Sequence, residues 1–202
     1  MNALKAKIVD TLRGAYMDRV AFSLGSYRIS GSMMRTVADH IESGQIMLIY
    51  RPSLKGRAEY DSVYDVLYVG FTELKNTKAA LLLHECVHAA MDAHGWNVNV
   101  TTSEALAYIA QAMYLQLAFA TNLDGGPFHV AANSIASTLL GRGTPSADQV
   151  IALRDALLAD ADYKDSYYAK AHYNGIHGFW RVAGGKLFEL AKYYYPDLAS
   201  AA

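Results

Sequence analysis

KAALLLHECVHAAMDA, residues 78–93, is the stretch that decides the fold, because its apolar pattern is typical of a buried α-helix. The residues expected to pack into the core share the side of this helix opposite its histidines: Leu82, Leu83, Cys86, Val87 and Ala90. Cys86 is the only cysteine of the chain, and on this side we expect a packed thiol rather than a ligand or a nucleophile. The run therefore predicts a helix that belongs to the hydrophobic core.

An HExxH motif, His84-Glu85-Cys86-Val87-His88, lies inside this run. Two histidines four residues apart lie about 40° apart on one helix face and roughly 6 Å apart along its axis. Both imidazoles can therefore reach one divalent cation, which is usually zinc. Glu85 lies about 100° further round the helix, where it could reach a water on the metal. The alternative is a polar stripe on an ordinary helix, but burying ionisable groups without partners is costly, and a metal would offset that cost.

A catalytic zinc site generally has three protein ligands and a water, so a third ligand is needed. Glu104 stands near the start of the next predicted helix, and a hairpin of two antiparallel helices could return it beside His84 and His88. The small residues of that helix would permit a close approach: Ala105, Ala107, Ala110 and Ala112. The alternative role for Glu104 is in a capping box with Thr101. We favour Glu104 as the third ligand because a carboxylate is needed and this one returns to the right place.

Two other residues near the motif compete with Glu104. His94 follows His84 by ten residues, which is the spacing of the metzincin pattern, but Met91 replaces the glycine that breaks the helix there. If the helix continues, His94 points about 80° away from His84, and a helix-end cap or an exposed side chain is expected instead. Asp92 lies a turn too far along the helix to close the site, so a supporting hydrogen bond or a solvated charge is expected.

The composition favours a compact folded chain and excludes several classes of protein. Of 202 residues, 52% are hydrophobic and 18% are charged, and the net charge is −1, which is unlike a disordered chain. Lysine and arginine are scattered, so no nucleic-acid partner is expected. The apolar residues 105–120 predict a core helix rather than a membrane span. With one cysteine and no apolar signal region at the start, we expect a cytoplasmic protein, or one exported without a cleavable signal peptide.

The pattern along the chain predicts a mostly helical α+β domain over residues 1–202, with a small antiparallel sheet before the HExxH helix. Strands are predicted at residues 45–51, 59–60 and 66–71. The HExxH helix is expected to be capped by Asn76 or Thr77 and to end near Gly95. The other predicted helices are residues 4–19, 33–42, 101–120, 128–140, 146–159, 163–171 and 179–195.

His84, Glu85, His88 and the downstream helical Glu104 together resemble the gluzincin branch of the zincin metallopeptidases, in its minimal single-domain form. The resemblance covers residues 66–117, which comprise a strand, the HExxH helix and the helix with the glutamate. It implies a zincin-like fold and a zinc-dependent endopeptidase that acts on a peptide or protein, with one Zn²⁺ per chain held by His84, His88 and Glu104. Glu85 would take a proton from the zinc-bound water and pass it to the leaving amine.

The resemblance also implies a donor for the tetrahedral oxyanion, since gluzincins use a histidine or a tyrosine there. Residues 171–178, AHYNGIHG, are expected to form a glycine-bearing loop between helices, where functional side chains often lie. His172 and Tyr173 are the expected catalytic residues of this loop, with His177 behind them; surface packing and helix capping are the alternatives. Residues 66–71 resemble the edge strand on which zincins lay an extended substrate.

Two other functions remain open at this point. A proteolytic toxin or effector domain would share the chemistry and act on one defined host target. A non-catalytic metal-binding or interaction module on a degenerate protease scaffold would differ in class. The retained Glu85 argues against the module, since a purely structural zinc site needs no general base.

Overall fold

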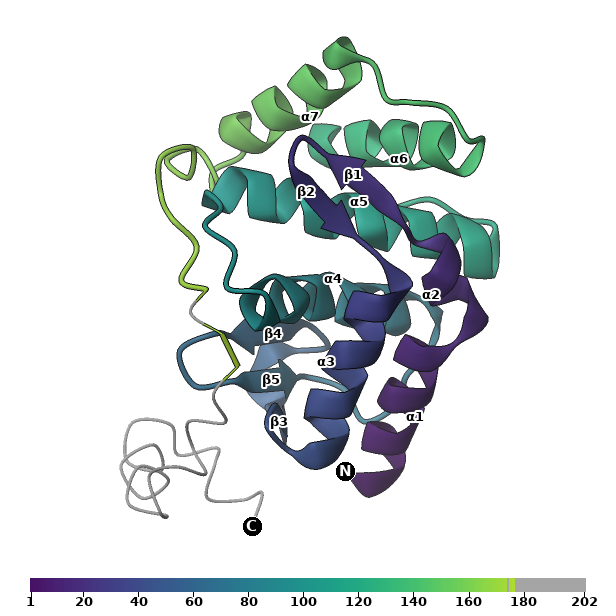
Figure 1. Cartoon of the computed structure of the whole chain (residues 1–202), viewed down its shortest axis with the longest axis vertical. Helices are drawn as coiled ribbons and strands as arrows, with labels where there is room; N and C mark the ends of the chain where they lie inside the picture. Colours follow the sequence, from purple (N-terminus) through teal and green to yellow (C-terminus); the bar gives the residue numbers. More distant parts are fainter. Residues whose placement is uncertain (174, 177–202) are drawn as a thin grey trace.

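The computed structural model describes residues 1–173, 175 and 176, and it has an α+β fold in which helices predominate (Figure 1). In chain order the helices are α1 (Asn2–Arg13), α2 (Ala15–Arg19), α3 (Gly31–Ser43), the 3-10 turn η1 (Pro52–Leu54), α4 (Asn76–Ala93), α5 (Val100–Phe119), α6 (Pro127–Leu140) and α7 (Ala147–Ala159). The strands are β1 (Phe22–Leu24), β2 (Tyr27–Ile29), β3 (Met47–Tyr50), β4 (Ala58–Asp61) and β5 (Val66–Val69). The predicted α+β, mostly helical class is confirmed.

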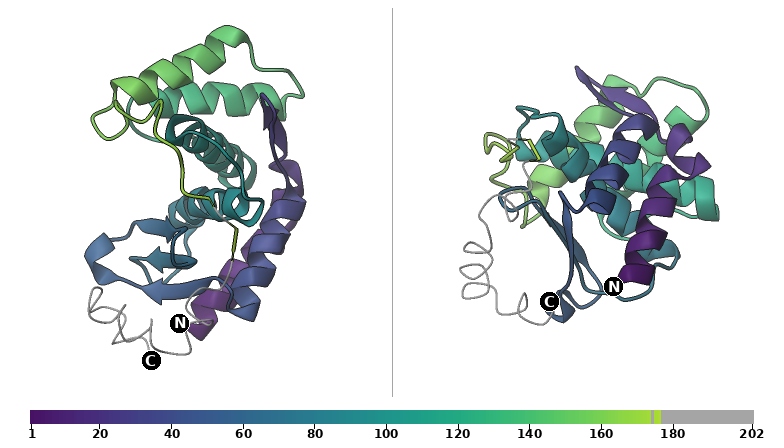
Figure 2. Two further views of the ribbon diagram at one scale, coloured as in Figure 1. Left: turned by 60° about the vertical axis from the view of Figure 1, so that its left-hand side comes forward. Right: turned by 60° about the horizontal axis from the view of Figure 1, so that its bottom comes forward.

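Helix α4, which carries the HExxH motif, packs against helices α3 and α5 and against strand β4 (Figure 2). The predicted core residues are at most 1% exposed: Leu82, Leu83, Cys86, Val87 and Ala90. The polar residues His84, His88 and Asp92 on the same helix are buried as well. Because buried polar groups are costly without partners, these three side chains must be matched by groups on the neighbouring elements.

Helices α4 and α5 form the predicted hairpin. Gly95, with φ of 57°, follows the end of α4 in the left-handed conformation that suits glycine. Helix α5 is capped by Asn99, whose side chain accepts a hydrogen bond of 2.7 Å from the backbone N–H of Thr102. The proposed capping box of Thr101 and Glu104 does not form, because Asn99 already fills the cap position. Glu104 is thus free to point elsewhere.

Strand β5 lies in the middle of a three-stranded sheet, in the order β3-β5-β4. Its pairing with β4 is antiparallel, with Tyr60 opposite Leu67, whereas its pairing with β3 is parallel. All four residues of β5 are buried. The expectation that residues 66–71 form an edge strand is therefore wrong, because β3 and β4 cover both edges of β5, and β4 is the edge strand beside the motif helix.

Other boundaries differ from the sequence predictions. The helix predicted at residues 4–19 is interrupted at Gly14, whose extended backbone (φ −68°, ψ 157°) separates α1 from α2. The short hairpin β1–β2 was not predicted from the sequence. The cap of α4 is Lys75, with no side-chain hydrogen bond, so the expected capping by Asn76 or Thr77 is wrong.

The predicted helix at residues 163–171 is wrong, because part of this segment pairs with the start of α5 instead. The N–H of Val100 donates to Ala169 O at 2.8 Å, and the N–H of Ala171 donates to Val98 O at 3.0 Å. These bonds hold residues 169–171 in an extended conformation. The helix predicted at residues 179–195 lies outside the described residues.

The apolar helix α5 is a core helix, as predicted, since most of its residues are buried. The four small residues expected to permit a close approach are buried: Ala105, Ala107, Ala110 and Ala112. Among the helices of the described residues, none combines the length and the apolar character needed to cross a lipid bilayer.

The buried position of Ala110 on α5 gives a test of the packing around this helix. Ala110→Leu should lower the free energy of unfolding by about 1–3 kcal/mol, because the side chain at this position is 0% exposed and added volume has no space. Urea unfolding followed by circular dichroism measures the change. Ala152→Leu, at an exposed position of α7, is the matched control and should stay within about 0.5 kcal/mol of the wild type. Equal effects of both substitutions would contradict the packing.

Candidate metal centre

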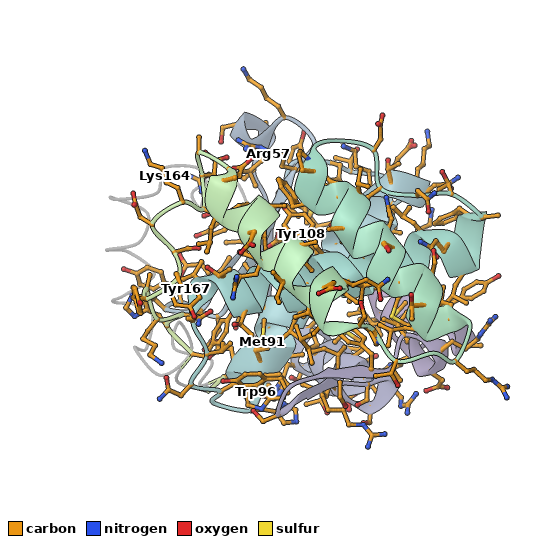
Figure 3. All side chains as sticks on the ribbon, turned by 90° about the horizontal axis from the view of Figure 1, so that it is seen from above. Arg57, Met91, Trp96, Tyr108, Lys164 and Tyr167 are labelled. Carbon is orange, nitrogen blue, oxygen red and sulfur yellow. The ribbon has the colours of Figure 1, made fainter. Side chains whose placement is uncertain are left out.

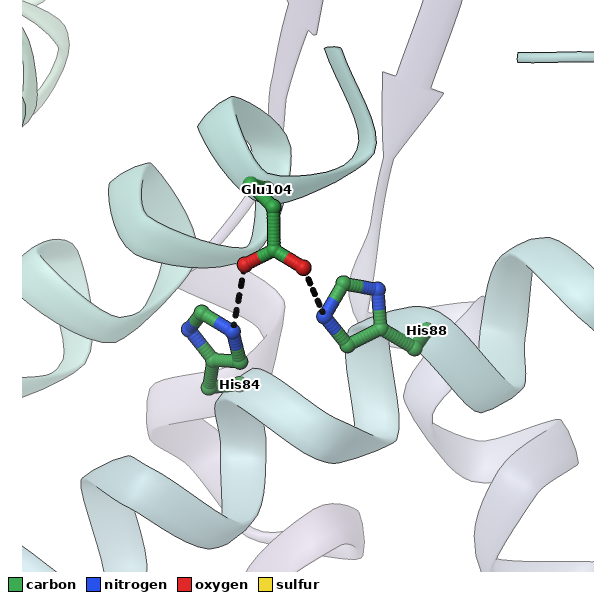
Figure 4. Close-up of side chains that lie close together, drawn as sticks. All are labelled: His84, His88 and Glu104. Atoms are coloured by element: carbon green, nitrogen blue, oxygen red, sulfur yellow. Dashed lines mark ion pairs between the residues drawn. The ribbon is translucent and has the colours of Figure 1, made fainter. Parts of the chain in front are cut away.

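Three side chains from the α4–α5 hairpin converge on one point (Figure 4). The Nε2 atom of His84 lies 3.3 Å from Glu104 Oε2, and the Nε2 atom of His88 lies 3.5 Å from Glu104 Oε1. One ligand atom from each residue lies within 4.8 Å of the other two. The group is therefore a His-His-Glu set that could hold a metal ion.

The Glu104 carboxylate faces both imidazoles, with a different oxygen beside the Nε2 atom of each ring. The three residues thus offer two nitrogen ligands and one carboxylate to the same position, which is a donor set that suits zinc. Glu104 Oε2 is buried and has no hydrogen-bond partner, which is the condition of a carboxylate oxygen that lacks its cation.

The opposite nitrogen of each imidazole is held by a polar neighbour. His84 Nδ1 contacts Gln111 Oε1 at 3.1 Å, and this amide oxygen can only accept, so His84 carries its proton on Nδ1. His88 Nδ1 contacts Ser103 Oγ at 2.9 Å and the Tyr173 hydroxyl at 2.8 Å. This arrangement leaves the Nε2 lone pair of His84 directed at the metal position and fixes the orientation of both rings.

The charges of the group also suit a cation. Burial alone would raise the pKa of Glu104, but His88 and His84 lower it to about 2. Burial lowers the pKa of His88 to about 4. At His84 burial acts in the same direction, yet the contact with Glu104 and the charge of Glu85 outweigh it and raise the pKa. The ionised carboxylate of Glu104 and the neutral imidazole of His88 are in the protonation states that metal binding requires, and at His84 a metal would displace the proton that the raised pKa favours.

Glu85 lies beside the ligand group and is fixed by strand β4. The backbone N–H of Tyr60 donates to Glu85 Oε2 at 2.9 Å. Burial raises the pKa of Glu85 to about 7, against the opposing effects of His84 and of the bond from Tyr60. A carboxyl group with such a pKa exchanges protons readily near neutral pH.

The ligand group opens into a cavity of about 700 Å³. Strand β4, helices α4 and α5, His129 of α6, and residues 162–163 and 170–173 contribute to its wall. Arg57 and Tyr108, two of the lining residues, are labelled in Figure 3. Glu85, His84, His88 and Glu104 all line this cavity, so a small molecule or an extended chain could reach the candidate metal position.

The residues predicted as oxyanion donors occupy different positions. His172 is exposed and lines the cavity. Tyr173 also lines it, but its hydroxyl contacts His88 Nδ1 and, at 2.7 Å, Ser103 Oγ. Tyr173 thus supports a ligand from the side away from the metal position. His177 lies outside the described residues.

The competing ligands lie apart from the His-His-Glu group. His94 Nδ1 donates to Ala90 O at 2.8 Å, which is the helix-end role expected as the alternative. Asp92 is fully buried and accepts a hydrogen bond of 2.7 Å from the Tyr60 hydroxyl, so the solvated charge considered for it is wrong and the supporting hydrogen bond is present.

Two cavity residues were missed by the sequence analysis. His129 stands in the first turn of α6, and its buried Nδ1 has no hydrogen-bond partner in the described structure. Tyr60 lies on β4 and contacts both Glu85 and Asp92. Neither residue is near the HExxH motif in sequence, and only the folded arrangement brings them to it. A lone histidine after the Asp124-Gly125-Gly126-Pro127 break is the sole sequence signal for His129.

In comparisons with known proteins, the chain matches no family model, no curated protein and no solved structure. The resemblance to gluzincins therefore depends on His84, Glu85, His88 and Glu104 and on the metal-binding geometry of three of them.

The His-His-Glu group predicts that Glu104→Ala weakens the binding of a divalent ion by on the order of 100-fold or more. Loss of a residue that only supports a ligand already lowers metal affinity about 10- to 100-fold, and this substitution removes a ligand itself. Titration with Zn²⁺ and Co²⁺ in competition with a chromophoric chelator measures the affinity. His94→Ala is the control and should bind as the wild type does. The reverse outcome, with His94→Ala impaired and Glu104→Ala intact, would transfer the ligand role to His94.

Proposed function

We propose that this chain is a zinc-dependent metallopeptidase that hydrolyses peptide bonds with Glu85 as its general base. The observation that carries the proposal is the convergence of His84, His88 and Glu104 within one open cavity, with the Glu85 carboxyl beside them. Two imidazoles and one carboxylate are a ligand set of catalytic zinc, which keeps a fourth position for water or substrate. A non-catalytic metal site would give no reason for a buried carboxyl group next to the ligands.

When bound, zinc would polarise the scissile carbonyl and lower the pKa of a water to about 7. The residues of the chain supply the proton transfers. Glu85 is held on one side by the Tyr60 N–H, which leaves its second oxygen for the proton of the attacking water. After the tetrahedral stage, Glu85 would pass that proton to the leaving amine.

Strand β4 supports an extended peptide as the substrate class. It is an edge strand, it lines the cavity, and its Tyr60 N–H points away from β5 toward Glu85. Because backbone groups alternate along an antiparallel strand, Ala58 has the same orientation as Tyr60, so its N–H and C=O face the free edge. A peptide that paired with Ala58 would run past the candidate metal position.

An imidazole on the cavity wall would serve the oxyanion better than Tyr173, whose hydroxyl is engaged with His88 and Ser103. We propose His129 for this role. Burial lowers its pKa and keeps it neutral, and its Nδ1 is enclosed without a partner, so Nε2 is the nitrogen left to meet a ligand. His172, exposed on the same wall, is the second candidate.

The general-base role predicts that Glu85→Gln lowers the rate of peptide cleavage by about 10²–10⁴-fold while the protein still binds one zinc per chain. The amide keeps the shape of the side chain and removes its basicity. Cleavage of a set of fluorescence-quenched peptides, together with metal analysis, gives both quantities. Removal of zinc with a chelator should abolish wild-type activity, and added zinc should restore it. A variant as active as the wild type would contradict the proposal and favour a non-catalytic module.

The edge-strand role predicts that Ala58→Pro raises KM by about 2- to 10-fold with kcat retained, because one backbone donor to the peptide is lost. Proline is tolerated on an edge strand where the missing N–H faces outward. Ala58→Ser keeps the N–H and is the control. Unchanged KM in Ala58→Pro would show that the substrate does not pair with this part of β4.

A further inference from the structure

Asp92 is a fully buried carboxylate that has no place in the proposed chemistry. It stands on α4 four residues after His88 and is 0% exposed. It accepts a hydrogen bond of 2.7 Å from the Tyr60 hydroxyl and one of 3.0 Å from the N–H of Gly175. It therefore joins α4 to two segments that are remote from it in sequence.

The first of these segments is strand β4. Tyr60 is attached to α4 at two points, since its hydroxyl bonds Asp92 and its backbone N–H bonds Glu85 Oε2. Glu85 and Asp92 are seven residues apart, which places them on one face of the helix within about 20° of each other. The contact at Asp92 thus fixes the strand that orients the carboxyl group of Glu85.

The second segment, here called the strap, comprises residues 169–173 and Gly175. It follows α7 and passes the start of α5 toward β4, as the yellow-green trace in Figures 1 and 2 shows. Its first part is held by the backbone bonds between Val100 and Ala169 and between Ala171 and Val98. Its last described part is held by the bond from Gly175 to Asp92. Between these two anchors lies Tyr173, whose hydroxyl supports His88 Nδ1.

We propose that Asp92 is a positioning residue that ties both β4 and the strap to α4, and thereby orients Glu85 and His88 together. Asp92 is not among the described residues that line the cavity, so it acts through Tyr60 and Tyr173 rather than on a substrate. The effect on catalysis rests on the proposed hydrolase function. The attachment of β4 and the strap to α4 is independent of that function, and it can be tested without metal or substrate.

The test compares hydrogen–deuterium exchange of the full chain in three variants, read by mass spectrometry over β4 and the strap. Asp92→Ala removes both acceptors and should speed exchange about 10-fold or more in both segments, as expected for bonds to a charged group. Asp92→Asn keeps one acceptor for the Gly175 N–H, and its amide can donate to the Tyr60 hydroxyl, so it should speed exchange less than Asp92→Ala does. Tyr60→Phe should speed exchange in β4 and leave exchange in the strap unchanged. If Asp92→Ala does not fold, the exchange of β4 in Tyr60→Phe still tests the inference.

The control is Tyr27→Phe, which removes a hydroxyl that donates to Asn97 O at 2.8 Å, away from the cavity. It should leave exchange in β4 and the strap at wild-type rates. Wild-type exchange in Asp92→Ala, or in Tyr60→Phe over β4, would overturn the inference. So would general acceleration across all helices of a folded Asp92→Ala protein, since that is the result of lost stability alone.

Two further readouts separate this inference from the proposed function. In the Co²⁺-loaded protein, Asp92→Ala should shift the visible absorption bands, because the strap no longer fixes His88, whereas Tyr60→Phe should leave them unchanged. With quenched peptides, Tyr60→Phe should lower kcat about 10-fold with KM within about twofold.

If the wild-type protein binds no Co²⁺ and cleaves no peptide, the proposed hydrolase function is contradicted, but the exchange experiment still tests the contacts of Asp92. The other outcome is that the wild-type protein binds Co²⁺ and cleaves peptides while Asp92→Ala keeps the wild-type absorption bands and Tyr60→Phe keeps the wild-type kcat. That result contradicts the positioning role of Asp92 and leaves the proposed hydrolase function intact.

Discussion

The contact between the Glu104 carboxylate and the two imidazoles of His84 and His88 is the constraint on which the site depends. All three groups are at least largely enclosed, with side-chain exposures of 15, 6 and 11% in that order. An ionised carboxylate in such a place must find a positive partner or several donors. Glu104 Oε2 has no hydrogen bond among the described residues, so a divalent ion held between the three side chains would give that oxygen a partner.

The start of helix α5 explains why Glu104 can take this position. A glutamate at the third position of a helix often turns back to cap the helix backbone. Here Asn99 is the cap residue, and its side chain accepts the bond from Thr102. Glu104 therefore lies beyond the first turn of the helix, and its carboxyl group is not drawn to the helix end. The turn between the two helices brings α5 back along α4, and the carboxylate then meets both histidines.

Local patterns predicted the parts of the site that belong to one helix or one hairpin. The HExxH spacing fixes the two imidazoles on one face, and the short connection to α5 returns Glu104 to them. Residues from distant segments could not be found in this way. Tyr60 reaches Glu85 only through the pairing of β4 with β5, and His129 reaches the cavity only through the packing of α6 on α5. The order of strands in the sheet is also a long-range property, so the sequence alone does not show that β5 lies in the middle of the sheet and β4 at its edge.

The wrong helix prediction at residues 163–171 also arises from long-range contacts, and here these contacts change the surroundings of the site. Tyr163, Tyr167 and Ala171 recur every four residues, as on one face of a helix, but helix propensity is a weak preference that tertiary contacts override. Pairing with residues 98–100 supplies two backbone hydrogen bonds and extends the chain. An extended segment covers more distance per residue than a helix does, about 3.3 Å against 1.5 Å. That added reach lets the segment pass from the start of α5 to Asp92 within a few residues, with Tyr173 at His88 on the way. The extended conformation of this segment, which its sequence does not predict, therefore brings a supporting hydroxyl group to His88, one of the three candidate metal ligands.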